Sequence, residues 1–131
     1  MRQELWPSQP DLHGRNIERY FEGDLEEPLE VLLAFDDSEV AVGFVELSIR
    51  AYAEGCESDR VAFLEGWYVD GVVRGKGIGA ALIRAAEDWA RSQGCTELGS
   101  SAEVDNAASA AAHRASGFTE TGVIRCFKKP V

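Results

Sequence analysis

The sequence predicts an α/β fold in which a mixed central sheet is flanked by helices. Residues 29–35 and 40–50 have the pattern of two strands joined by a short polar turn, which indicates an antiparallel hairpin. Residues 61–69 form a further strand, and a long amphipathic helix separates it from a short strand at 95–100. Two strands joined by a helical crossover run parallel and right-handed. The sheet should therefore be antiparallel at first and parallel later.

Length and composition indicate one domain over residues 1–131. The hydrophobic content of 45% and the charged content of 27% are ordinary for a globular protein with one core. No apolar run approaches the roughly 18 residues of a membrane span, and the N-terminus does not resemble a signal peptide. We therefore expect a cytoplasmic protein with no membrane partner. The net charge of −10 argues against nucleic acid and favours a cationic ligand.

The cysteine pattern predicts neither a disulfide framework nor a metal site. Cys56, Cys95 and Cys126 are odd in number and irregularly spaced. We expect reduced thiols and no bound metal.

The N-terminal residues carry the weakest pattern. Residues 12–21 can form a short helix, and the chain before Pro7 is kept from helical geometry by the proline. Trp6 either covers the core or contacts a ligand, and the sequence leaves both roles open.

The strand at 61–69 has large β-forming side chains on both faces, which predicts an interior position in the sheet. Glu65 lies in its middle. A carboxylate is costly to bury in an apolar strand without a purpose, so Glu65 is a candidate functional residue. The alternative is a structural ion pair with Arg50 or Arg60.

A glycine-rich turn follows this strand, Arg74-Gly75-Lys76-Gly77-Ile78-Gly79. A helix begins directly behind it, so backbone N–H groups, the positive end of the helix dipole and two cations meet at one point. Such a place binds phosphate. A dinucleotide fingerprint with Glu97 downstream is disfavoured, because residues 70–74 separate the glycines from the strand. A Walker loop would end in Gly-Lys-Ser/Thr, and this turn has no such ending. The remaining alternative is a glycine-rich connection that binds no ligand.

The helix is predicted over residues 77–93, where Gly94 ends it. Its expected buried face repeats with helical spacing and comprises Ile78, Ala81, Leu82, Ala85, Ala86, Trp89 and Ala90.

A second helix is predicted over residues 106–116, because the segment is rich in alanine. Asp105 or Asn106 can cap its start. Gly117 ends it, and residues 118–128 are expected to form a final strand.

The turn from Arg74 to Gly79, placed after a hydrophobic strand, resembles the coenzyme A pyrophosphate loop of the GNAT N-acetyltransferases. Asn106, His113 and Gly117-Phe118 extend the likeness, with Ser109 in place of an alanine and His113 at the position of a tyrosine that commonly contacts the leaving thiolate. More narrowly, the chain resembles the aminoglycoside 6'-N-acetyltransferases. That likeness is carried by the segments Leu5-Trp6-Pro7, Tyr52-Ala53-Glu54-Gly55-Cys56, Phe63-Leu64-Glu65-Gly66 and Gly94-Cys95.

The resemblance implies the GNAT fold and direct transfer of an acetyl group from acetyl-CoA to a small cationic amine, above all the 6'-amine of an aminoglycoside. Glu65 would act as general base or as an anion for the acceptor, and His113 would donate to the departing sulfur. Trp6, Tyr52 and Ser101 would line the acceptor site with Glu65. The residues implied to bind acetyl-CoA are Tyr68, Val69, Arg74, Gly75, Lys76, Gly77, Ile78, Gly79, Asn106 and His113.

The chain departs from this branch in two ways. Ser100-Ser101 stands where the branch typically has Ser-Asp, so Ser101 can hydrogen-bond an acceptor but cannot neutralise it. Only four residues precede Leu5, whereas the superfamily starts with a strand and a helix before this position. Either the start is incomplete or the first strand and helix are absent, which would leave an exposed sheet edge and favour a homodimer. The alternative functions are a CoA-binding module without aminoglycoside activity, or an acetyltransferase for another polyamine or a protein amine.

Overall fold

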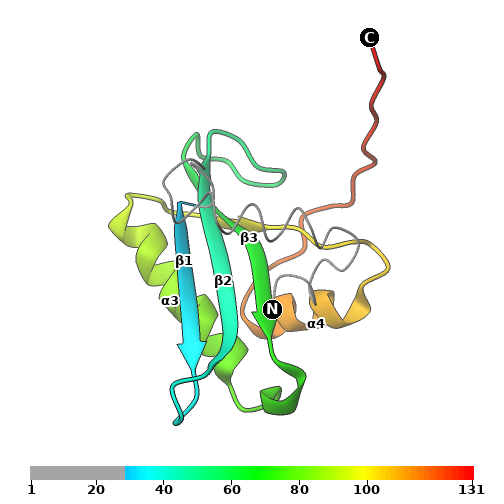
Figure 1. Cartoon of the computed structure of the whole chain (residues 1–131). Coiled ribbons are helices and arrows are strands. Elements are labelled where there is room, and N and C mark those ends of the chain that lie inside the picture. The colour runs from blue at the N-terminus through cyan, green and yellow to red at the C-terminus, as the bar shows by residue number, and fades with distance from the viewer. Residues whose placement is uncertain (1–28) are drawn as a thin grey trace. The chain divides into compact units, whose positions relative to one another are not determined.

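The computed structural model describes residues 29–131. Residues 29–101 and residues 102–131 belong to two separate compact units. Figure 1 labels most of the helices and strands of the described part of the chain. Trp6 and the helix expected at 12–21 lie outside the described residues.

A four-stranded sheet in the order β1-β2-β3-β4 forms the centre of the first unit. β1, β2 and β3 are antiparallel, and β4 runs parallel to β3. The mixed sheet and the interior position of β3 are therefore confirmed. The strands are β1 (Glu30–Phe35), β2 (Ala41–Arg50), β3 (Val61–Val69) and β4 (Leu98–Ser100).

β4 is shorter than the strand predicted at 95–100. The amides of Gly94 and Cys95 donate to Arg91 O and Ala90 O, at 3.0 Å each, and so complete the end of the preceding helix. Gly94 has a φ of 78°, the left-handed geometry that stops a helix. The chain consequently enters the sheet only at Leu98.

Helix α3 (Ile78–Ser92) lies against one face of the sheet (Figure 1). Its position agrees with the prediction to within one residue, because Gly77 and Gln93 are its caps. The predicted buried face was partly wrong. Ala81 and Ala85 line an open groove beside β1, while Ile83 is fully buried. The buried residues of the helix are Leu82, Ile83, Ala86 and Ala90.

β3 contains a β-bulge at Glu65. Leu47 pairs with Leu64 and Glu46 pairs with Gly66, so Glu65 is the extra residue between two register pairs. Bulges bend a strand, re-aim a side chain and are frequent beside active sites. The core around it is tight, because Val45, Leu47, Ser48 and Val61 are fully buried.

The second unit contains helix α4 (Ala107–Ala115). Asn106 caps it through its side-chain oxygen, which accepts from Ser109 N at 3.0 Å, and Gly117 follows with a φ of 93°. Both features agree with the predicted helix.

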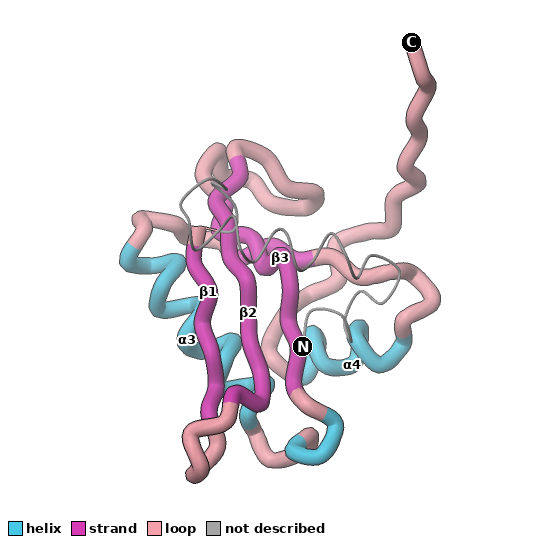
Figure 2. The backbone as a smooth tube through the Cα atoms, viewed as in Figure 1, coloured by secondary structure: helices cyan, strands magenta, loops and turns pink. Residues whose placement is uncertain are grey.

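The final strand predicted at 118–128 was wrong. Figure 2 shows this segment as loop throughout. Beyond Phe118, its apolar side chains are open to solvent, with Val123, Ile124 and Phe127 exposed by 65%, 59% and 90%. A strand needs a neighbouring ladder, and the described residues provide none for this segment.

A 3-10 turn, η1 (Gly71–Val73), links β3 to the glycine-rich turn, and Asp70 caps it. Among residues 29–131, no helix is long and apolar enough to cross a membrane.

Candidate functional site

Glu65 is held by two neighbours on β2. Ser48 Oγ donates to its Oε1 at 2.5 Å, and Arg50 Nη2 donates to its Oε2 at 2.8 Å. The ion pair with Arg50, one of the alternatives that the sequence left open, is therefore present. Arg60 is not the partner, since its Nε donates to Gln93 O at 2.9 Å.

The glycine-rich turn has the backbone geometry of an anion site. Gly75 and Gly77 both have a φ of 82°, in the left-handed region, and a Cβ on either would meet no atom within 4 Å. The space over the turn is thus open to a ligand. The first bond of α3 runs from Ala81 N to Gly77 O at 3.0 Å, and Gly77 supplies no side-chain cap. The amide groups ahead of Ala81 lack an acceptor within the helix and can donate to an anion.

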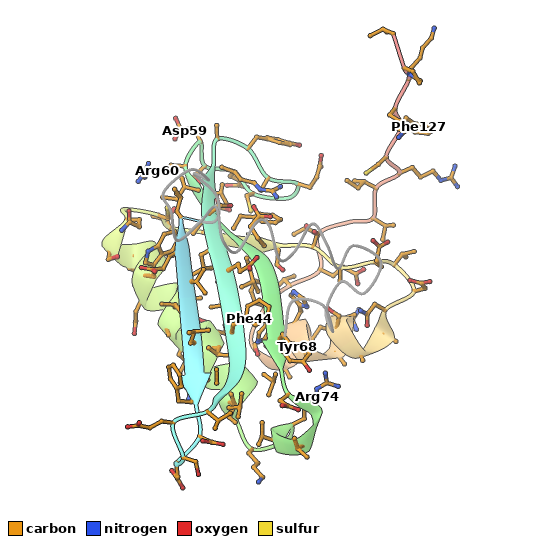
Figure 3. The ribbon with its side chains drawn as sticks, in the orientation of Figure 1. Phe44, Asp59, Arg60, Tyr68, Arg74 and Phe127 are labelled. Atoms are coloured by element: carbon orange, nitrogen blue, oxygen red, sulfur yellow. The ribbon has the colours of Figure 1, made fainter. Side chains whose placement is uncertain are left out.

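Arg74 folds back onto the end of β3 (Figure 3). Its Nε donates to Val69 O at 2.9 Å, and its Cζ lies 5.7 Å from the centroid of the Tyr68 ring. Tyr68 in turn packs near Phe44, with 6.0 Å between ring centroids. The Val69 carbonyl therefore already has a donor in this arrangement. An added extended chain at this carbonyl would require Arg74 to swing toward the turn.

The glycine-rich turn from Arg74 to Gly79 could hold the phosphates of acetyl-CoA, because it brings together two cations, open backbone amides and the N-terminus of α3. Lys76 is exposed, as is Arg74. Among residues 29–131, no cluster of three or more His, Cys, Asp or Glu side chains could hold a metal ion.

The loop between β2 and β3 carries Tyr52, which is 66% exposed. A hydrogen bond to Glu54 raises the pKa of the Tyr52 hydroxyl, so the phenol stays neutral at physiological pH. Ala53 fastens the start of this loop by packing against Val61 and Phe63.

Glu97 anchors the other side of the loop, a role that the sequence did not indicate. Its carboxylate accepts from Glu57 N at 3.0 Å and from Ser58 N at 2.7 Å. These amide donors lower the pKa of Glu97. Glu97 thus anchors the loop between β2 and β3.

Replacing Glu97 by Gln should make the free energy of unfolding less dependent on pH in the acid range. The pKa of Glu97 lies below its usual value of 4.5, so the folded state favours the carboxylate. This stabilisation is fully present above the usual value and is lost as the pH falls through the lowered one. Urea unfolding at pH 7 and at successively lower pH should show the stability gap between wild type and Glu97→Gln closing with acid. A gap that stays constant would contradict the anchor.

Ser101 is exposed and follows the last residue of β4. Ser100 pairs with Leu64, the neighbour of Glu65, so Ser101 lies one residue beyond the last register pair of β3 and β4. No hydrogen bond between Ser101 and Glu65 is present within the described part of the chain.

His113 and Asn106 belong to the second unit. His113 Nδ1 lies 2.7 Å from Ser109 O and 3.3 Å from Ser109 Oγ, and the ring meets Phe118 edge-on at 5.1 Å between centroids. A carbonyl oxygen only accepts, so Nδ1 carries the proton. In the neutral ring Nε2 then has the lone pair, and it can donate only when the ring is doubly protonated. The side-chain oxygen of Asn106 is engaged in the helix cap.

Comparison with known proteins identifies the family of the chain. The family model described as the acetyltransferase (GNAT) family matches residues 1–118. An aminoglycoside N(6')-acetyltransferase type 1 from Klebsiella aerogenes is 50% identical over 132 residues, covering 100% of this chain and 87% of the relative. A protein of the same name from Stenotrophomonas maltophilia is 39% identical over 132 residues, and the match covers 100% of this chain and 84% of that relative.

Solved structures give the same result. The aminoglycoside acetyltransferase AAC(6')-Iy, in complex with the bisubstrate analogue CoA-S-monomethyl-acetylneamine, superposes with a TM-score of 0.87 at 34% identity, covering 100% of this chain and 88% of that one. AAC(6')-Ih from Acinetobacter baumannii superposes with a TM-score of 0.74 at 42% identity, and the match covers 77% of this chain and 69% of that one. The family model covers residues 1–118 and the relatives match the whole chain, so the chain belongs to the GNAT family of acetyltransferases.

Proposed function

We propose that the protein transfers an acetyl group from acetyl-CoA directly to the 6'-amine of an aminoglycoside. The observation that carries this proposal is the position of Glu65, a carboxylate on a bulge of β3, the strand that precedes the glycine-rich turn. The relatives named above, which include a complex with a CoA–aminoglycoside analogue, supply the class of acceptor. An acidic chain also suits a cationic substrate.

In the proposed mechanism, Glu65 takes a proton from the acceptor ammonium, directly or through a water. The neutral amine nitrogen then forms a bond to the thioester carbonyl carbon and gives its second proton to water. The carbon–sulfur bond breaks, and the electron pair leaves with the sulfur. Arg74, Lys76 and the open amides of the turn hold the phosphates. Tyr68, Val69 and their neighbours guide the pantetheine arm. Most of the rate comes from holding amine and thioester together.

His113 is proposed to supply the leaving sulfur with a proton or hydrogen bond. Because its Nδ1 is committed to Ser109 O, this role needs the imidazolium form. Asn106 acts in this proposal by fixing the start of the helix that carries His113. Trp6, Tyr52 and Ser101 are proposed to line the acceptor site.

A second candidate function is a CoA-binding module without aminoglycoside activity. It is favoured by the Arg50 guanidinium on Glu65 and by Ser101, which brings no charge to the acceptor. Another polyamine or a protein amine as acceptor is the third possibility.

A thiol-release assay with acetyl-CoA separates these candidates. The acceptors are aminoglycosides with and without a 6'-amine, spermidine, and a no-acceptor control. Turnover confined to compounds with a 6'-amine is the expected result. Binding of acetyl-CoA without any turnover would overturn the aminoglycoside assignment in favour of the module.

The same proposal treats residues 1–131 as one acetyltransferase domain in the cytoplasm. Cys56, Cys95 and Cys126 are free, as in proteins kept in a reducing compartment. The charge of −10 makes nucleic acid an unfavourable partner.

We propose a homodimer through the edge formed by β1. Within the described sheet, β1 is an outer strand, and its side chains Leu33 and Phe35 are exposed by 47% and 59%. An apolar groove lined by residues 31–35 and by Ala81, Leu82 and Ala85 adjoins this strand. An exposed edge next to apolar surface favours pairing with another chain.

The double substitution Leu33→Glu with Phe35→Glu should shift the protein from dimer to monomer. Two carboxylates on the edge would repel a second copy and remove its apolar contact. Sedimentation velocity measures the change, with Val72→Glu as control, since Val72 is 82% exposed in η1. A dimer that survives the double substitution, or a wild-type monomer, would contradict this interface.

A further inference from the structure

The two oxygens of Glu65 have different surroundings. Oε1 accepts three hydrogen bonds, from Ser48 Oγ at 2.5 Å, Arg50 Nε at 3.0 Å and Arg50 Nη2 at 2.9 Å. Oε2 accepts one, from Arg50 Nη2 at 2.8 Å. A carboxylate has about four acceptor sites, two on each oxygen. Oε1 is therefore saturated, while Oε2 keeps an acceptor direction for another donor.

Arg50 itself is held in place. It is the last residue of β2, and its Cζ lies 3.6 Å from the centroid of the Phe63 ring. Phe63 is 6% exposed and fills the space over Gly99, where an added Cβ would lie 3.1 Å from Phe63 Cδ2. The ring has little freedom to move, and a guanidinium stacked on a fixed ring has a defined orientation.

Ser48 is fixed as well, since it is fully buried in β2. Its hydroxyl lies on the strand next to the bulge, where Ser48 pairs with Phe63. Glu65 thus accepts one hydrogen bond from the buried Ser48 hydroxyl and three from the Arg50 guanidinium, which stacks on Phe63.

Stability does not account for this arrangement. The Arg50 and Glu65 side chains are 42% and 25% exposed, and ion pairs this open contribute little to folding. A bulge that re-aims one carboxylate, with two residues orienting it, is instead what a reacting group requires.

We propose that Ser48 and Arg50 are positioning residues that anchor Oε1 of Glu65 and present Oε2 to the acceptor amine. The proton leaving the ammonium goes to Oε2. This inference rests on the proposed function, because it assumes that Glu65 receives that proton.

The test uses the whole chain with three substitutions. Arg50→Met keeps an apolar stem over Phe63 but removes the donors, Arg50→Lys keeps the charge without the fork, and Ser48→Ala removes the hydroxyl. Arg91→Met is the matched control, because Arg91 is an exposed arginine paired with Asp88 on α3 at 3.0 Å. The measurements are kcat and KM for the amine, the Kd of acetyl-CoA, and Tm.

Arg50→Met should lower kcat about 10-fold or more, since a misplaced reacting group costs up to about 100-fold. The Kd of acetyl-CoA and the Tm should match those of the control. Arg50→Lys should restore only part of kcat, because an ammonium cannot reproduce the two-pronged contact. Ser48→Ala should also reduce kcat, and it provides the test if Arg50→Met does not fold.

Wild-type kcat in both Arg50→Met and Ser48→Ala would overturn the inference. So would a lower KM for the amine with kcat unchanged in Arg50→Met, because Arg50 would then compete with the substrate. Glu65→Gln, measured alongside, separates the two levels. If Glu65→Gln stays active, the proposed role of Glu65 fails; if it is inactive while the other variants are normal, only the positioning role fails.

Discussion

Replacing Glu65 by Gln should lower kcat/KM for the amine about 10²- to 10⁴-fold, the usual contribution of general acid–base catalysis. An amide has nearly the shape of a carboxylate and can still accept from Ser48, but it cannot take a proton from an ammonium at neutral pH. Arg50 is 42% exposed, so water can solvate its guanidinium on the Phe63 ring when the carboxylate is lost. The fold should therefore survive, and acetyl-CoA should bind with unchanged affinity.

Steady-state kinetics and calorimetric titration with acetyl-CoA measure the two effects separately. Glu87→Gln is the control, because Glu87 pairs with Arg91 on the outer side of α3 at 3.6 Å. Equal losses in amine turnover and in acetyl-CoA affinity would assign Glu65 to general integrity of the site. Full activity would remove it from the mechanism.

Local sequence signals were enough to predict most of the first unit. The hairpin, β3, the glycine-rich turn and α3 are each encoded within one contiguous segment, by alternation, glycine spacing or helical periodicity. The face of α3 was less well defined, because alanines at 81 and 85 are apolar in the pattern yet small enough to line a groove. The segment at 118–128 failed for another reason, since strand propensity without a neighbouring ladder does not make a strand.

The sequence singles out individual candidate residues of the site, but it does not indicate the hydrogen-bond network that joins them. Glu65 stands out as a charge in an apolar strand, yet the choice between Arg50 and Arg60 depends on the register of β2 against β3. The bulge shifts that register, and no local pattern indicates it. Ser48 and Glu97 were missed because a buried serine and a loop-anchoring glutamate look like ordinary polar residues until distant segments meet.

The double substitution Arg74→Gln with Lys76→Gln should raise the Kd of acetyl-CoA about 100-fold or more. A hydrogen bond to a charged group contributes roughly 1.5–3 kcal/mol, and about 1.4 kcal/mol corresponds to a tenfold change in affinity. Calorimetric titration measures the change. At saturating acetyl-CoA, kcat should recover toward wild type, because neither cation lies at the reacting atoms in the proposed mechanism.

The two single substitutions should differ in size. Arg74 must give up its bond to Val69 O and its contact with Tyr68 before it reaches a phosphate, so part of its gain is offset. Lys76 has no polar partner among residues 29–131 and loses nothing comparable. Lys76→Gln should therefore weaken acetyl-CoA binding more than Arg74→Gln, with Arg84→Gln, farther along α3, as the unaffected control. A larger effect of Arg74→Gln would mean that the contacts of Arg74 with β3 do not compete with phosphate binding. An equal effect of Arg84→Gln would mean that all three cations act on acetyl-CoA only through general electrostatic attraction.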